Sequence, residues 1–261
     1  MTDGVPRGGL EGKVALVTGG GRGIGRAIAG ALAADGAAVS VVARSEPEVR
    51  AAADEIGGTY VAVSLATEAG CLHAVSETRR ALGPISILVN NAGVGSYHER
   101  PIWDQKTETW RESMALNLDA PFWLTRLAAA DMVAQRWGRI VMVSSTAGEV
   151  GAPAMSAYCA SKHGMIGLMR SVAADTIEHG VTCNAVLPGW VRTTMGDADA
   201  EAEGRARGMT ADDVWAERAQ SYAAKRVLDP VEIAGVVRFL ASDEASGVNG
   251  EALTVALGSH W

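Results

Sequence analysis

Apolar residues along the chain follow two alternating patterns. Short runs rich in Val, Ile and Leu recur, and longer Ala-rich segments with helical spacing separate them. In the first such segment Ile24, Ile28 and Leu32 share one helical face, and Gly36 follows as a stop signal. Parallel strands joined by crossover helices produce this alternation. We expect strands near residues 14–18, 38–43, 59–64, 86–90, 139–144, 181–186 and 252–256.

The Ala-rich segments predict helices on both sides of this sheet. Besides the first, their expected ranges are 46–56, 68–82, 107–136, 156–179, 211–223 and 230–241. The chain shows no repeat and no Pro/Ser linker long enough to divide it. We therefore expect one α/β domain over residues 1–261, built on a doubly wound parallel sheet.

One segment, residues 194–226, interrupts the alternation between the sixth and seventh strands. Its acidic residues, Asp197 to Glu203, give way to Arg205 and Arg207, and a helix-like stretch containing Trp215 follows. A long excursion at this place is typical of a lid or binding loop. A pair of solvated surface helices is the alternative.

The composition is that of an ordinary globular domain. Hydrophobic residues make up 48% of 261 and charged residues 20%, and the 31 Gly follow no collagen-like period, which excludes disordered and fibrous classes. A formal net charge of −7 argues against a general nucleic-acid or anionic-membrane surface. Small molecules and other protein chains are the expected partners.

Cysteine and histidine spacing predicts no metal site. Cys71, Cys159 and Cys183 stand far apart and are expected to be reduced structural thiols. The five His show no ligand spacing, although the loop that holds His98 is a candidate border of a substrate site. The opening MTDGVPRGG has no apolar signal-peptide core, and no apolar stretch is long enough to span a bilayer, so the cytosol is the expected compartment.

A glycine-rich turn links the first strand to the first helix. The strand KVALV (13–17) runs into TGGGRGIG (18–25). Such glycines allow a tight turn and close backbone approach, and a helix N-terminus offers free N–H groups to a pyrophosphate. The position predicts a dinucleotide site, with a ligand-free turn as the alternative.

Further motifs follow the later strands. NNAG (90–93) comes after the fourth, and ALNLDAPF contains Asn117. Ser144-Ser145 closes the fifth, YCASK contains Tyr158 and Lys162, and Pro188-Gly189 precedes Thr193. In this order, with TGGGRGIG as a TGxxxGxG pattern, the motifs resemble those of the short-chain dehydrogenase/reductases over almost the whole chain. The resemblance implies strand order 3-2-1-4-5-6-7 and a nicotinamide-dependent oxidoreductase.

The resemblance also assigns catalytic roles. A phenol of pKa about 10 needs its anion stabilised before it can act at neutral pH, and an ammonium group one helical turn away can do so. Tyr158 and Lys162 are spaced i, i+4 and share a face. By resemblance Tyr158 donates a proton to a carbonyl, and Lys162 lowers its pKa and holds the ribose. Ser145, which we prefer to Ser144, bonds the substrate oxygen, and Asn117 keeps a relay water in place.

The end of the second strand indicates the nucleotide. NAD enzymes of this kind place a carboxylate there, whereas this strand ends Val41-Val42-Ala43-Arg44. Arg22 and Arg44 are expected to clamp a 2′-phosphate, which predicts NADP; the alternative is that Arg22 is solvated and Arg44 only stacks on adenine. Ser64 replaces an Asp that commonly meets the adenine. The expected nucleotide contacts are Thr18, Gly19, Arg22, Gly23, Ile24, Gly25, Arg44, Ser64, Leu65, Asn91, Ala92, Gly93, Tyr158, Lys162, Pro188, Gly189 and Thr193.

Similarity to two groups of the family bears on the substrate. YCASKHG and CNAVLPGWV resemble ketoacyl and polyketide ketoreductases, whereas EHGVTCNAVLPG and ARGMTADDV (206–214) resemble 3-hydroxybutyrate dehydrogenases, which normally use NAD. We expect NADPH-dependent reduction of a 3-oxoacyl- or polyketide-type ketone that contacts Ser145, Tyr158 and Trp190. The alternatives are an NAD-dependent 3-hydroxybutyrate-type dehydrogenase, a dinucleotide-sensing protein, which would be expected to lack Tyr158 or Lys162, and a dehydratase or epimerase on the same fold, which would usually alter Ser145. Trp190 and Trp215 are candidates either for an apolar pocket or for packing.

The resemblance further implies a homodimer or homotetramer. The helices near 107–136 and 156–179 would pack across a two-fold axis, as in other members of the family.

Overall fold

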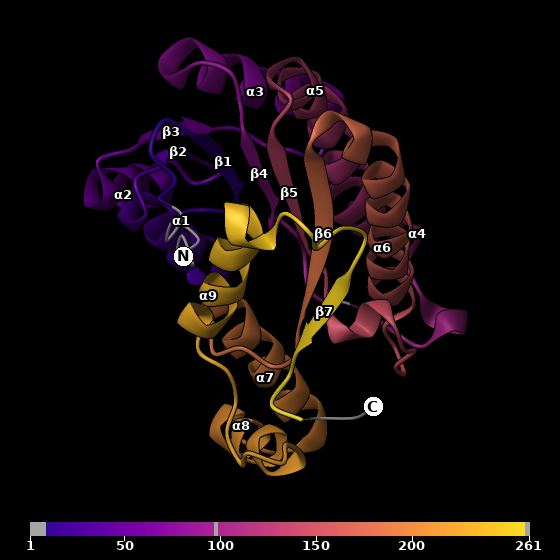
Figure 1. Ribbon diagram of the computed structural model, residues 1–261. Helices are drawn as coiled ribbons and strands as arrows, with labels where there is room; N and C mark the ends of the chain where they lie inside the picture. The colour runs from indigo at the N-terminus through magenta and orange to yellow at the C-terminus, as the bar shows by residue number, and fades with distance from the viewer. Residues whose placement is uncertain (1–8, 97–98, 259–261) are drawn as a thin grey trace.

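The computed structural model describes residues 9–96 and 99–258; His98 lies outside these ranges. Within them, parallel strands form one sheet in the order β3-β2-β1-β4-β5-β6-β7 (Figure 1), which confirms the expected doubly wound architecture. The strands are β1 (Val14–Thr18), β2 (Ala38–Ala43), β3 (Thr59–Ala62), β4 (Ile87–Asn90), β5 (Gly138–Val143), β6 (Val181–Pro188) and β7 (Ala252–Val255).

The central strands β1, β4, β5 and β6 are buried on both faces, which explains their continuous apolar runs. In β1 every residue is buried, and side chains alternate between the two sides. Ala15 and Val17 contact one hydrophobic core, and Val14 and Leu16 the other.

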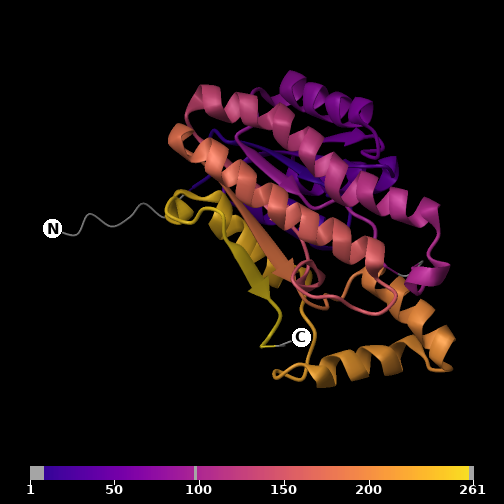
Figure 2. The ribbon, with the colours of Figure 1, turned by 90° about the vertical axis from the view of Figure 1, so that its right-hand side faces the viewer.

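Two helical layers cover the sheet (Figures 1 and 2). One contains α1 (Gly23–Ala34), α2 (Glu46–Ile56) and α9 (Pro230–Ala241), whose Ile28, Val49 and Val237 enter the same core. The other contains α3 (Glu68–Leu82), α5 (Ala120–Gln135) and α6 (Ser156–Thr176). Short 3₁₀ helices are Ile102–Asp104, Thr146–Gly148, Ile177–His179 and Asp243–Ala245.

The helix expected over residues 107–136 is divided into three parts. α4 (Thr107–Met114) leads into a π-helical segment, Ala115–Asp119, and then into α5. Pro121 explains the change of hydrogen-bond spacing, because it has no N–H to donate to the carbonyl of Asn117 four residues earlier. The same turn therefore contains Asn117.

The segment that breaks the strand–helix alternation forms two helices, α7 (Thr194–Arg207) and α8 (Ala211–Ser221). Asp197 in the first turn of α7 and Arg205 and Arg207 in its last complement the helix dipole. Ala200, Val214 and Trp215 form a small core between the helices. The pair lies beyond the carboxyl ends of the strands (Figures 1 and 2) and is folded structure and not an irregular loop.

Candidate active site

A cavity of about 550 Å³ lies at the carboxyl ends of the strands. This edge, where the strand order reverses between β1 and β4, is where open α/β sheets bind ligands. Thr18 and Asn117 are buried behind the cavity wall. The other predicted site residues line it, namely Gly19, Arg22, Gly23, Ile24, Gly25, Arg44, Ser64, Leu65, Asn91, Ala92, Gly93, Ser145, Tyr158, Lys162, Pro188, Gly189, Trp190 and Thr193.

The turn after β1 has the shape that a pyrophosphate needs. Gly19 and Gly23 adopt φ angles of 65° and 54°, which favour glycine. A Cβ on Gly25 would stand 2.2 Å from the Gly19 carbonyl oxygen, so a side chain there would displace the loop. Arg22 at the N-cap of α1 makes no side-chain cap, which leaves the first N–H groups of the helix available to a ligand. The turn therefore fits a dinucleotide.

Thr18 and Asn91 hold the two sides of this crevice together. The Thr18 hydroxyl donates to the Val89 carbonyl at 3.1 Å and accepts from the N–H groups of Asn91 and Ala92 at 2.9 and 3.0 Å. The Asn91 side chain donates back to the Thr18 carbonyl at 2.9 Å. These contacts fix the end of β1 against the end of β4.

The nucleotide end of the cavity contains both predicted arginines. Arg22 and Arg44 are exposed, and Ser64 lies nearby in the lining. Glu48, on the first turn of α2, also lines the cavity, and its carboxylate is 3.4 Å from an Arg22 nitrogen. This pair was not foreseen. Because both side chains are well exposed, it is worth at most about 1 kcal/mol, and a phosphate can compete for Arg22.

The chemistry-bearing side chains meet where β5 faces α6. Tyr158 and Ser145 share a side-chain hydrogen bond, and the Ser145 oxygen also accepts from the Ala147 N–H at 3.1 Å. Lys162 is 4% exposed, and its ammonium donates to the Val143 carbonyl at 2.9 Å and lies 5.7 Å from the Tyr158 ring centre. Ser144, by contrast, donates to the Lys162 carbonyl at 3.1 Å, which supports Ser145 as the residue for substrate.

Burial shifts the pKa values of Tyr158 and Lys162 in opposite senses. It raises the pKa of Tyr158 to about 12, although the hydrogen bond with Ser145 opposes the rise. It lowers the pKa of Lys162 to about 8, so the ammonium is still mostly charged at pH 7. Burial decides the direction of this shift, and the lowering of the Tyr158 pKa by Lys162 that the resemblance implies stays a prediction. A protonated phenol suits a proton donor.

Asn117 anchors the loop after β4. Its amide oxygen accepts from the Val94 N–H at 2.8 Å, and its amide nitrogen donates to the Val94 carbonyl at 3.2 Å and to the Ser161 hydroxyl at 3.1 Å. A Cβ on Gly93 would lie 2.9 Å from this amide oxygen. The relay-water role of Asn117 stays a prediction.

Glu99 is a site residue that sequence reasoning missed. Its carboxylate accepts from the N–H groups of Ala157 and Tyr158 at 2.8 and 2.7 Å and from the Gln105 amide at 2.8 Å. It therefore caps the start of α6 from a distant loop and holds the backbone of Tyr158 in place. The motif YCASK carries no sign of this partner, because the contact spans 59 residues of chain.

The PG…T element shapes the wall beneath α7. Pro188 ends β6, a Cβ on Gly189 would lie 2.2 Å from the Tyr222 hydroxyl, and the Thr193 hydroxyl caps α7 by accepting from the Gly196 N–H at 3.1 Å. Trp190 lines the cavity, whereas Trp215 is buried between α7 and α8, 6.4 Å from the Trp190 ring centre. Of the two tryptophans, only Trp190 is in the pocket lining.

The described part of the chain shows no cluster of His, Cys, Asp or Glu that could hold a metal ion. The three cysteines are free and buried, as expected of structural thiols.

Comparison with known proteins places this site in a family. A sequence model of the short chain dehydrogenases matches residues 13–204. The chain belongs to the short-chain dehydrogenase family. It is an oxidoreductase, and the seven-stranded sheet is the fold of that family.

Two curated members of the short-chain dehydrogenase family are similar to this chain in sequence along almost its whole length. The 3-oxoacyl-(acyl-carrier-protein) reductase FabG of Escherichia coli is 38% identical over 248 residues, which cover 94% of this chain and 96% of the relative. The D-beta-hydroxybutyrate dehydrogenase of Cupriavidus necator is 36% identical over 247 residues, covering 92% and 95%.

Solved structures of the family superpose closely. Levodione reductase has a TM-score of 0.89 and an actinorhodin polyketide ketoreductase variant crystallised with NADPH has 0.90. Each is 30% identical to this chain and aligns over 94% of it and 96% of its own length. Among the helices of the described residues, none has the length and apolar character to cross a membrane.

Proposed function

We propose that this short-chain dehydrogenase reduces a 3-oxoacyl-type ketone to the secondary alcohol with NADPH. The observation that carries the proposal is the grouping of Tyr158, Ser145 and Lys162 in the cavity that also contains the glycine loop. Similarity to a 3-oxoacyl-(acyl-carrier-protein) reductase and to ketoreductases supports the substrate class.

Each side chain of the site has a separate role in the proposed reduction. The nicotinamide, when bound, supplies hydride to the carbonyl carbon. Ser145 donates a hydrogen bond to the carbonyl oxygen, and Tyr158 donates its phenolic proton to the same oxygen as charge develops there. Lys162 stabilises the resulting tyrosinate and holds the ribose, and the glycine loop with the start of α1 binds the pyrophosphate.

We also propose that residues 194–226 form the lid of this site. Trp190, Met195 and Asp199, which lie before and along α7, line the cavity beside Tyr158. Substrate bound there would be enclosed between α7 and the strand ends.

The deciding experiment is a panel of carbonyl substrates with NADPH and NADH. We expect turnover of neutral 3-oxo esters and thioesters, with NADPH preferred. The second candidate is an NAD-dependent 3-hydroxybutyrate-type dehydrogenase, which the Cupriavidus relative favours. Preference for NADH together with turnover of 3-hydroxybutyrate would establish the dehydrogenase function and contradict the proposed NADPH-dependent ketone reduction.

Arg44→Asp should weaken NADPH and improve NADH. The variant loses a charge-assisted contact to the 2′-phosphate, adds a repelling carboxylate, and supplies an acceptor for a ribose hydroxyl. We expect NADPH to lose at least ~1.4 kcal/mol, a factor of ten. Arg22→Ala should weaken NADPH selectively, since it also leaves Glu48 facing the phosphate.

The measurement is kcat/KM for both nucleotides with each variant. Arg50→Ala is the matched control, because Arg50 is exposed on α2, pairs with Glu46 and lies outside the cavity lining. A wild-type enzyme that already prefers NADH would contradict the proposal that Arg22 and Arg44 bind the 2′-phosphate of NADPH.

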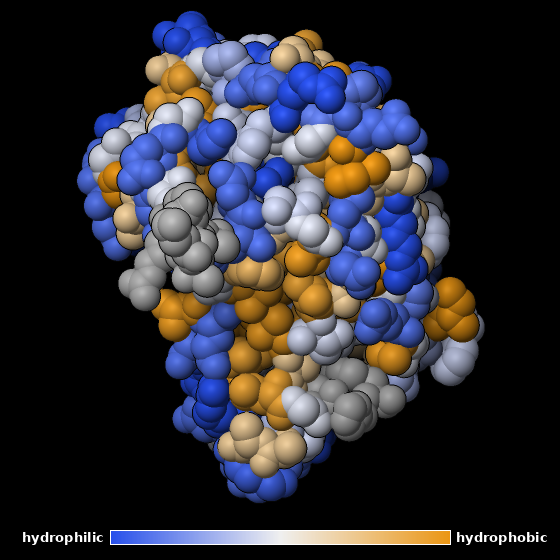
Figure 3. Space-filling model, viewed as in Figure 1, coloured by the Kyte–Doolittle hydropathy of each residue, from blue (hydrophilic) through white to orange (hydrophobic). Residues whose placement is uncertain are grey.

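A dimer or tetramer is proposed as the working form. Trp110 on α4 and Phe122 on α5 are 40% and 45% exposed, and apolar side chains also gather over α9 and β7 (Figure 3), where Val231 and Phe239 are exposed. A second copy of the chain could bury such surfaces through isologous contacts. Sedimentation at micromolar concentration should show two or four copies, and a monomer would contradict the proposal.

A further inference from the structure

A single carboxylate faces the cavity from α7. Asp199 lies on the second turn of that helix, its side chain is 18% exposed, and it lines the cavity together with Tyr158 and Trp190. Its charge also adds to the rise in the pKa of Tyr158. The carboxylate is therefore near enough to the reacting end of the cavity to act on whatever binds there.

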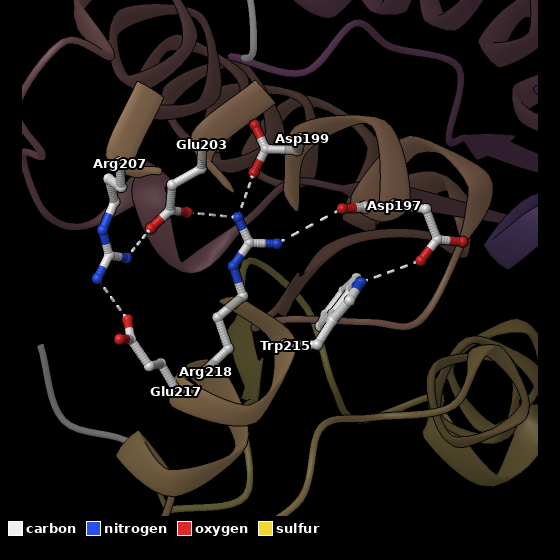
Figure 4. Close-up of polar contacts among 8 residues, drawn as sticks. Asp197, Asp199, Glu203, Arg207, Trp215, Glu217 and Arg218 are labelled. Atoms are coloured by element: carbon white, nitrogen blue, oxygen red, sulfur yellow. Dashed lines mark hydrogen bonds and ion pairs between the residues drawn. The ribbon is translucent and has the colours of Figure 1, made fainter. Parts of the chain in front are cut away.

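Arg218, from α8, holds this carboxylate in place (Figure 4). Its guanidinium is 2.8 Å from both Asp199 and Glu203 and lies 3.6 Å from the Trp190 ring centre. The arginine is only 6% exposed, so the contacts form away from solvent. Asp199 is thus positioned by a buried partner, which in turn packs on a tryptophan of the cavity wall.

The arginine does not cancel the negative charge around the cavity. Arg218 is shared between two carboxylates, and Glu203 in turn meets Arg207 at 2.6 Å, which also binds Glu217 at 2.7 Å (Figure 4). The two guanidinium groups of Arg207 and Arg218 thus pair with three carboxylates. The network keeps a net negative charge, and Asp199 is its member in the cavity lining.

The described lining offers no cation for an acidic substrate beside this carboxylate. Its basic residues are Arg22 and Arg44 at the nucleotide end and Lys162, whose ammonium is bound to the Val143 carbonyl. The segment that holds Asp199 adds apolar wall, because Trp190 before α7 and Met195 one turn earlier on α7 also line the cavity, whose other apolar lining residues include Val150, Met155 and Val191. A substrate carboxylate placed there would lose hydration and meet a like charge.

We propose that Asp199 is a specificity-determining residue that admits uncharged 3-oxo esters and thioesters and rejects free 3-oxo acids. The proposal rests on the proposed function, because it names the substrate class of the same site. On this proposal the enzyme differs in substrate preference from dehydrogenases that act on free hydroxy acids.

The test compares ethyl acetoacetate, S-acetoacetyl-N-acetylcysteamine and acetoacetate as substrates of the full-length enzyme with saturating nucleotide. Wild type should favour both neutral compounds over acetoacetate in kcat/KM. Asp199→Asn, which is nearly isosteric, should lower that preference by at least about tenfold, because one like charge is removed from a desolvated site. The change should lie mainly in the KM for acetoacetate, since the charge opposes binding.

Two matched variants separate charge in the cavity from damage to the lid. Glu201→Gln removes the same charge from α7 at an exposed position outside the lining, and Glu203→Gln removes the other carboxylate of Arg218. Glu201→Gln should keep the wild-type preference, whereas Glu203→Gln should lower it in part, because Arg218 is then no longer shared and offsets more of the Asp199 charge. If Glu201→Gln lowers the preference as much as Asp199→Asn does, or if Asp199→Asn leaves it unchanged, the proposal is overturned.

The outcome also tells the two proposals apart. Reduction of the neutral compounds with an unaltered preference in Asp199→Asn removes the specificity role and leaves the ketoreductase function standing. Failure of wild type to reduce any of the three compounds with either nucleotide removes both. Efficient reduction of acetoacetate by wild type contradicts the specificity role directly.

Discussion

Tyr158→Phe should lose nearly all ketone reduction and keep its affinity for nucleotide. The substitution removes the only proton that the tyrosine side chain can donate, and a general acid contributes roughly 10²–10⁴-fold to rate. The ring remains, so the packing of α6 against the cavity is retained. The measurements are kcat/KM for a neutral 3-oxo ester and the Kd for NADPH.

Tyr60→Phe provides the matched control for this substitution. Tyr60 lies on β3, where its ring faces Arg50 and not the cavity, so the same loss of a hydroxyl should leave reduction intact. Retention of more than about a tenth of wild-type activity in Tyr158→Phe would show that another group supplies the proton.

Lys162→Met should impair both turnover and nucleotide binding. Methionine fits the space of the lysine stem but carries no charge, so neither the tyrosinate nor the ribose keeps its cationic partner. A hydrogen bond to a charged group is worth about 1.5–3 kcal/mol, which corresponds to a loss in nucleotide affinity of about ten- to a hundredfold. Because Lys162 is buried and desolvation lowers its pKa to about 8, loss of the charge should not unfold the protein.

Titration calorimetry for the Kd, steady-state kinetics for kcat and a thermal melt test these expectations together. Lys225→Met is the control, since Lys225 also donates to a backbone carbonyl, that of Gln220, but is exposed and outside the lining. Unchanged nucleotide affinity in Lys162→Met would remove the ribose role, and unchanged turnover would remove its role toward Tyr158.

Local sequence patterns were sufficient to predict the strands of the sheet and most of the residues that line the cavity. The central strands are short apolar runs buried on both faces, and the edge strands β3 and β7 are only partly buried. The glycine loop and NNAG follow strand ends, and Tyr158 and Lys162 of YCASK lie one helical turn apart on α6, so all three motifs line the same cavity. The Gly25 position shows why the pattern is strict, because a Cβ there would meet the Gly19 carbonyl.

Contacts between distant segments were not predictable in the same way. Glu99 caps a helix that begins far along the chain, Glu48 reaches back to Arg22, and Arg218 crosses between helices to hold Asp199. Each depends on tertiary packing that a linear pattern of polar residues does not encode. The upward shift in the Tyr158 pKa was missed for a related reason, since spacing indicates a neighbouring charge but not the extent of burial.

The π-helical turn at Ala115–Asp119 limits how this region can change in length. Substitutions within it alter single contacts, but inserting or deleting one residue changes the number of residues that the wide turn holds and moves Asn117 to a different position around the helix. Asn117 would then turn away from Val94, and the loop after β4 would lose its anchor. Insertions and deletions should therefore be tolerated far less at this turn than in the exposed connection between α7 and α8, where no such anchor depends on helical phase.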